Sequence, residues 1–77
     1  MPKVLIPDKL AHGLLPTVKP LKTFAGLGNG RLCDGCERSI TATDLEYELD
    51  FADERTVRLH KDCLAIWLQA TGIDKNP

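Results

Sequence analysis

Four residues that can bind one metal ion stand in two close pairs, and they constrain this chain more than any other feature. Two residues separate Cys33 from Cys36 and His60 from Cys63, and 23 residues lie between the pairs. One turn can present each pair, and the spacer is long enough for a β-hairpin to bring the pairs together. Three thiols and one imidazole match a closed tetrahedral site, so we expect one structural Zn²⁺ ion.

The small size of the chain also favours a metal. A chain of 77 residues allows one domain, which buries little apolar surface and usually needs disulfides or a metal ion. Its three cysteines cannot all pair with one another, so a disulfide framework is a poor interpretation. Structural zinc contributes about 10–16 kcal/mol in finger peptides. We therefore expect folding to depend on the metal.

Charge and proline content divide the chain. Residues 1–32 hold five basic residues and one acidic residue, whereas residues 33–77 hold ten acidic and five basic residues. We predict a basic Pro/Gly-rich arm over residues 1–30, a zinc-binding domain over 31–72 and a frayed C-terminus over 73–77. Prolines interrupt helices and strands, so we expect the arm to be mostly unstructured, with short apolar anchors at residues 4–6 and 14–15.

A hairpin and a helix are expected within the metal-binding part. Apolar and acidic residues alternate over 45–51, which predicts a half-buried strand, and residues 56–59 predict its returning partner after a turn at 52–55. We expect the acidic face to meet Arg55 and Arg58. Apolar residues at three- and four-residue spacings predict a helix over 61–71, ended by Gly72. The same periodicities place the aromatic residues in the core; these are Tyr47, Phe51 and Trp67.

Glycines have two expected roles. The glycine-rich segment 26–30 superficially resembles a phosphate-binding loop, but no strand pattern precedes it and no helix can follow it, so we expect a flexible lead-in. Gly35 should supply the permissive φ of the turn between the first two cysteines. At the second pair, we expect the start of the helix to stabilise the Cys63 thiolate.

A knuckle, a hairpin and a helix carrying the last two ligands form the arrangement of treble-clef zinc fingers. The pattern Cys33-x2-Cys36-x23-His60-x2-Cys63 resembles the first zinc module of a LIM domain. It is more similar to small bacterial single-module proteins with CxxC, a charged hairpin and HxxC before a Trp-bearing helix. The resemblance covers residues 31–71. It implies a small α+β, zinc-stabilised, treble-clef-like fold with these four residues as ligands.

The predicted function is that of a non-catalytic protein-interaction or regulatory module. Four protein ligands leave no coordination position for a catalytic water, so we expect no enzymatic activity. Phosphate binding needs concentrated positive charge, whereas the metal-binding part is acidic, so another protein is the favoured partner. Two alternatives stay open, a nucleic-acid-associated finger that uses the basic arm and a redox-responsive zinc-thiolate switch.

Other classes of site and location have less support in the sequence. A thioredoxin-like role for Cys33 and Cys36 would need a larger βαβ fold, and His12 in the arm is a weak candidate ligand. We identify no small-molecule substrate. No apolar run approaches the roughly 20 residues of a membrane span and no signal-peptide pattern is present, so we expect a soluble, cytoplasmic protein.

Overall fold

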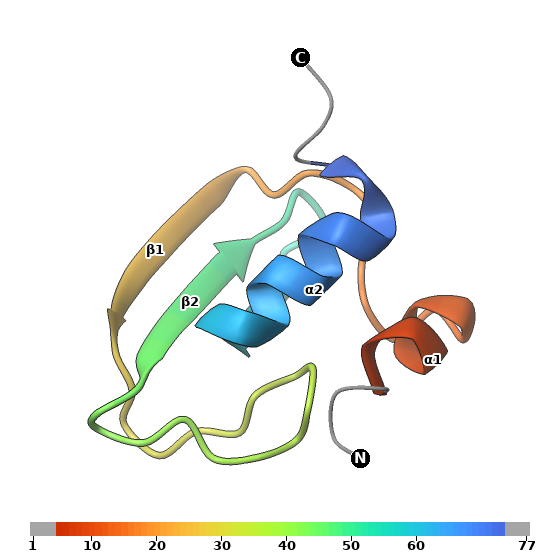
Figure 1. Cartoon of the computed structure of the whole chain (residues 1–77). Helices are drawn as coiled ribbons and strands as arrows, with labels where there is room; N and C mark the ends of the chain where they lie inside the picture. The colour runs from red at the N-terminus through yellow and green to blue at the C-terminus, as the bar shows by residue number, and fades with distance from the viewer. Residues whose placement is uncertain (1–4, 74–77) are drawn as a thin grey trace.

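One three-stranded antiparallel sheet organises the part of the chain that the structure, a computed structural model, describes, which is residues 5–73. The elements follow the chain in the order α1 (Leu5–Ala11), β1 (Lys22–Leu27), β2 (Leu45–Asp50), β3 (Thr56–His60) and α2 (Lys61–Thr71). The strands lie in the order β1-β2-β3, and α2 crosses one face of the sheet (Figure 1). The predicted α+β class is confirmed.

The β2–β3 hairpin forms where the alternating pattern predicts it. Leu49, Val57 and Leu59 are buried against the helix side, and Glu46, Glu48 and Asp50 lie on the opposite face of β2. Arg58 lies 3.9 Å from both Glu46 and Glu48, as expected. Arg55 instead pairs at 3.4 Å with Asp53 inside the turn, because both residues lie in the loop beyond the paired strands.

Helix α2 has the predicted bounds and the predicted end. Gly72 adopts the left-handed conformation (φ 74°) and its N–H donates to the Leu68 carbonyl, which satisfies one of the last acceptors of the helix. Trp67 is 1% exposed and meets Phe51 edge-on, with ring centroids 6.1 Å apart. These two aromatic residues belong to the core, as predicted, while Tyr47 is half-buried.

The prediction of a mostly unstructured arm is wrong for two segments. Residues 5–11 form α1, which tolerates Pro7 because the first N–H groups of a helix have no partner within it. Residues 22–27 form β1, which gains its order from antiparallel pairing with β2. Among the expected anchors, Ile6 and Leu15 are buried, Leu14 is exposed, and residue 4 lies outside the described residues. Of the predicted frayed end over 73–77, Ile73 is buried in the core, and residues 74–77 lie outside the described residues.

The glycine-rich segment is ordered rather than a flexible lead-in. Gly26 lies in β1, the Gly28 N–H donates to the Asp44 carbonyl at 3.0 Å, and the Gly30 N–H donates to the Ile40 carbonyl at 2.8 Å. A Cβ on Gly28 would overlap the backbone carbonyl oxygens of Ile40 and Thr41. Glycine is therefore required there for close backbone approach.

Candidate metal centre

The first ligand pair lies in a tight loop between Gly30 and Ile40. The Cys33 N–H donates to the Arg38 carbonyl and the Glu37 N–H donates to the Cys33 carbonyl, both at 2.9 Å. Two further N–H groups point at the Cys33 sulfur, from Gly35 at 3.3 Å and from His60 at 3.4 Å. This loop, residues 33–38, is hereafter the knuckle. It presents both cysteines from one turn, with their side chains buried.

Gly35 serves the knuckle by its size and not by its φ. Its φ is not in the left-handed region, which Glu37 occupies instead with φ 65°. A Cβ on Gly35 would lie 3.0 Å from the Ile6 side chain and 3.2 Å from Cys63 Cβ. The expectation of a permissive φ is thus wrong, because the missing side chain makes room for α1 and α2.

The second ligand pair spans the junction of β3 and α2. His60 ends the strand with extended backbone (φ −63°, ψ 159°) and Cys63 lies in the first turn of the helix. The chain passes directly from β3 into α2 at His60, so His60 and Cys63, which are three positions apart, can face the same side. Cys63 is 4% exposed and His60 is half-buried.

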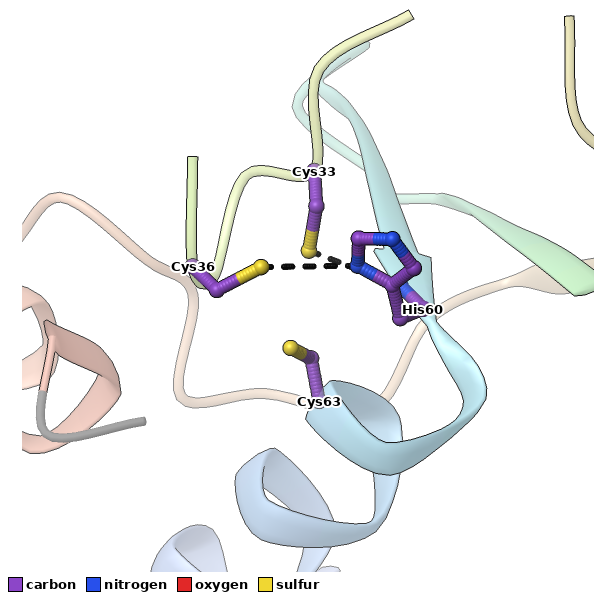
Figure 2. Close-up of side chains that lie close together, drawn as sticks. All are labelled: Cys33, Cys36, His60 and Cys63. Carbon is purple, nitrogen blue, oxygen red and sulfur yellow. Dashed lines mark hydrogen bonds between the residues drawn. The ribbon is translucent and has the colours of Figure 1, made fainter. Parts of the chain in front are cut away.

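All four predicted ligand side chains meet at one point. Their sulfur atoms and a ring nitrogen of His60 lie within 4.8 Å of one another, and the side chains point toward a common centre (Figure 2). With Zn–S distances of about 2.3 Å, the donors of a tetrahedral site lie about 3.8 Å apart. The cluster is therefore positioned to bind one metal ion with little contraction.

The ring of His60 is oriented by groups on the side away from the sulfurs. Nδ1 lies 3.4 Å from the Cys36 sulfur, and Nε2 lies 3.1 Å from the Ser39 carbonyl oxygen and 3.7 Å from Asp44. An Nε2–H that donates to the carbonyl leaves Nδ1 with its lone pair toward the cluster. The Asp44 carboxylate is in turn held by the N–H and the hydroxyl of Thr41, both at 3.0 Å.

Sequence reasoning missed these supporting groups. Any residue offers a backbone carbonyl, so nothing in the sequence marks Ser39 as the partner of His60. The Thr41-x-x-Asp44 spacing was a readable signal, because a carboxylate three residues after a threonine can reach back to its N–H. That hydrogen bonding lowers the pKa of Asp44, and the carboxylate stays ionised beside His60.

The cysteines differ in acidity when no metal is bound. Burial would raise the pKa of Cys33, but hydrogen bonds from backbone N–H groups outweigh it and lower the pKa to about 7. Burial and then the nearby charge of Cys33 raise the pKa of Cys63. The expected help from the helix start is therefore outweighed at Cys63. Because a metal binds thiolates, loading the cluster must displace the Cys63 proton.

Helix α1 packs directly on the knuckle, which the sequence did not indicate. Ile6 is fully buried and lies against Gly35. The Lys9 ammonium donates to the Asp34 carbonyl and pairs with Glu37, both at 2.8 Å. His12, the other imidazole, lies outside the cluster, with Nδ1 2.8 Å from the Asp8 carbonyl. The arm therefore supports the metal centre by packing and charge and adds no ligand from its described residues.

Comparison with known proteins adds no family to these observations. No protein-family model matches the chain, and neither the curated proteins nor the solved structures yield a significant match. Neither helix within residues 5–73 is long and apolar enough to cross a membrane.

Proposed function

We propose that the chain is a small treble-clef-like protein that binds one structural Zn²⁺ and acts as a non-catalytic protein-interaction module. The convergence of Cys33, Cys36, His60 and Cys63 within 4.8 Å carries the proposal. Three thiolates and one imidazole form a donor set typical of closed structural zinc sites. The N–H groups aimed at Cys33 and the carbonyl behind His60 are the kind of second-layer support that such sites have.

The treble-clef assignment is supported by the order of the parts. The knuckle is followed by the β2–β3 hairpin, and the last two ligands lie at the end of β3 and the start of α2. Helix α1 and strand β1 are additions before this core. Three free cysteines suit a reducing compartment, so we propose the cytoplasm as the location.

A non-catalytic role follows from the closed donor set. When bound, the ion supplies a crosslink between the knuckle and the β3–α2 junction. The four residues together fill a tetrahedral shell, so no position is left for a water or substrate. We therefore expect the surfaces around the site to bind a partner protein and so to act in regulation.

A protein is favoured as the partner over a nucleic acid. Among the basic residues of the arm, Lys9 is engaged by Glu37 and Asp34 on the knuckle, so its charge is already paired. Strand β2 carries a row of carboxylates, which repels phosphate. In contrast, several large apolar side chains are exposed, and exposed apolar patches often mark protein contacts; they include Leu21, Phe24, Leu27, Leu32 and Leu45.

Metal analysis tests whether the four clustered residues bind zinc. The purified chain should contain one equivalent of zinc, and His60→Ala should lower both content and affinity. His12→Ala is the matched control, because it removes the imidazole outside the cluster and should keep one equivalent. Absence of zinc from the native chain, or equal zinc loss in both variants, would refute the site.

Affinity capture from native lysate tests the partner class. Recovery of a protein that resists nuclease treatment supports the proposed role. Recovery that is lost with nuclease, together with oligonucleotide binding that weakens steeply with salt, would assign the arm to nucleic acid instead.

A further inference from the structure

The outer edge of β1 is left open in the described part of the chain. Strand β1 pairs only with β2, and no segment within residues 5–73 pairs with its other edge. The outer edge of β3 differs, because the Asp34 N–H donates to the Arg58 carbonyl at 2.7 Å and its carboxylate accepts the Arg58 N–H at 2.8 Å. An unpaired edge is a template for another strand.

The pairing register shows which backbone groups of β1 face outward. Gly28, just beyond β1, donates its N–H to Asp44, and the register pairs Gly26 with Glu46 and Phe24 with Glu48 in the same series. Hydrogen-bonded and non-hydrogen-bonded pairs alternate along an antiparallel ladder. The N–H and C=O groups of Thr23 and Ala25 therefore point away from β2.

The side chains of this edge are apolar and exposed. Every residue of β1 is exposed, with Phe24 at 51% and Leu27 at 71%, and the preceding Leu21 is 69% exposed. The strand has no proline, and its one charged residue, Lys22, stands at its first position. Devices that usually protect an edge, such as proline, bulges and central charges, are missing from this strand.

We infer that β1 pairs antiparallel with β1 of a second copy of this chain, about a two-fold axis at Phe24. This deepens the proposed protein-interaction role and rests on it. In this register Phe24 faces itself, Thr23 lies opposite Ala25 of the second copy, and Leu27 meets the segment just before the partner strand, where Leu21 is exposed. Each large apolar side chain of the edge thus meets another one. The outward backbone groups of Thr23 and Ala25 bond to each other across the axis.

Charge complementarity also favours a second copy. The same register places Lys22 opposite Gly26 of the second copy, so the two ammonium groups do not oppose each other. No atom lies within 4 Å of a Cβ position on Gly26, which leaves space above it. Beyond Gly26 on that face lies its β2 neighbour Glu46. The backbone of this Lys22 lies two strand spacings, about 9–10 Å, from that of Glu46, a span that the lysine and glutamate side chains can bridge together over the glycine.

Glu46 lacks a strong cation within the described part of its own chain. Its nearest cationic partner is Arg58 at 3.9 Å, and its Oε1 has no hydrogen-bond partner among residues 5–73. The acidic row of β2 holds Glu48 and Asp50 as well. A lysine from a second copy would balance this row at both ends of the paired sheets.

Sedimentation of the zinc-loaded full chain tests the pairing. Edge-to-edge contact of one short strand belongs to the small, weak class of interfaces. The protein concentrations should therefore extend to about 1 mM, where even a dimer of millimolar affinity is detected. We expect the mass to rise toward twice the 8.5 kDa of one chain. Phe24→Glu and Phe24→Lys should each remain monomeric, because like charges would then face each other across the axis.

Mixing the two variants gives the decisive result. An equimolar mixture of Phe24→Glu and Phe24→Lys should recover the dimer, since residue 24 then faces an opposite charge. Leu32→Glu is the matched control: Leu32 is 62% exposed but lies outside β1, and the dimer should persist. A mixture that stays monomeric would overturn the two-fold axis at Phe24.

Zinc content, measured on each sample, separates this inference from the proposed function. A zinc-loaded chain that is monomeric at every concentration would overturn self-pairing and leave the metal site intact. Self-pairing would also be overturned if the chain is monomeric and captures a protein from lysate that the Phe24→Glu variant does not capture. The edge of β1 would then be assigned to that different protein. A metal-free dimer would refute the zinc site and support the pairing.

Discussion

In the described part of the chain, the outer edge of β3 is hydrogen-bonded and the outer edge of β1 is not. At β3 the knuckle supplies a carboxylate and an N–H to Arg58, and Cys33 accepts the His60 N–H. At β1 no described residue bonds to the outer edge, and the side chains there are exposed. Besides presenting two of the four clustered residues, the knuckle therefore caps the edge of β3. Within residues 5–73, the edge of β3 is hydrogen-bonded to the knuckle, and the outer edge of β1 has no such partner.

The largest effect should come from breaking the metal side. Cys63→Ser removes one of four ligands, and structural zinc sites contribute about 10–16 kcal/mol in finger peptides. We expect amide NMR dispersion to collapse over β2, β3 and α2, and over α1 as well, because Ile6 and Lys9 pack on the knuckle. Chelation of the native chain should do the same and zinc should reverse it. A dispersed spectrum from the variant would contradict this dependence.

The next largest effect should come from the support beneath the knuckle. Ile6→Ala deletes a fully buried side chain, which costs about 2–5 kcal/mol in tightly packed sites. Urea unfolding of the zinc-loaded chain measures the loss. Leu14→Ala, in the same arm but 64% exposed, is the control and should change stability by less than about 0.5 kcal/mol. Equal effects would mean that α1 is not anchored.

A smaller effect should follow from opening the closed edge. Asp34→Ala removes the acceptor of the Arg58 N–H. An unsatisfied donor costs about 1–3 kcal/mol when fully buried, and this part-buried one should cost no more than that. Hydrogen exchange at the Arg58 amide should accelerate accordingly. Asp34→Asn keeps an acceptor oxygen and should lose less. If both variants retain native exchange while holding one zinc, the carboxylate does not cap the edge.

The smallest effect is expected at the open edge. Leu27→Ser replaces a side chain that is 71% exposed, so the free energy of unfolding should change by no more than about 0.5 kcal/mol at dilute concentration. Thermal unfolding of the zinc-loaded monomer provides the measurement. A loss as large as that of Asp34→Ala would mean that the two edges carry similar stability, and the contrast between them would fail.

The sequence predicted the parts whose burial follows a regular period. The alternation of Leu49 with acidic neighbours and the spacing of Cys63 and Trp67 report a buried face, so the hairpin and α2 were readable. Strand β1 has no buried residue, so its sequence carries no alternation to read. Helix α1 is seven residues long with one buried residue, which is too short for a periodic signal. Pro7 also argued against a helix there.

The candidate site was readable for a different reason. Thiols and imidazoles are rare and chemically specific, so their spacing alone was enough to predict the candidate ligands. The structure brings all four together; they are Cys33, Cys36, His60 and Cys63. Their supports are mostly backbone groups, such as the Ser39 carbonyl and the Gly35 N–H, which every sequence offers. Steric fit could not be predicted from the sequence either, because the space that Gly35 leaves for Ile6 depends on a helix that the sequence did not predict.

One hydrogen bond joins the arm to the middle of α2. The indole of Trp67 donates to the main-chain carbonyl of Pro16 at 2.8 Å, across 51 positions of sequence. A carbonyl survives any substitution of its own side chain, whereas the indole exists only in tryptophan. A substitution can therefore remove this hydrogen bond directly only at Trp67, so position 16 tolerates side-chain changes more readily than its buried neighbour Leu15.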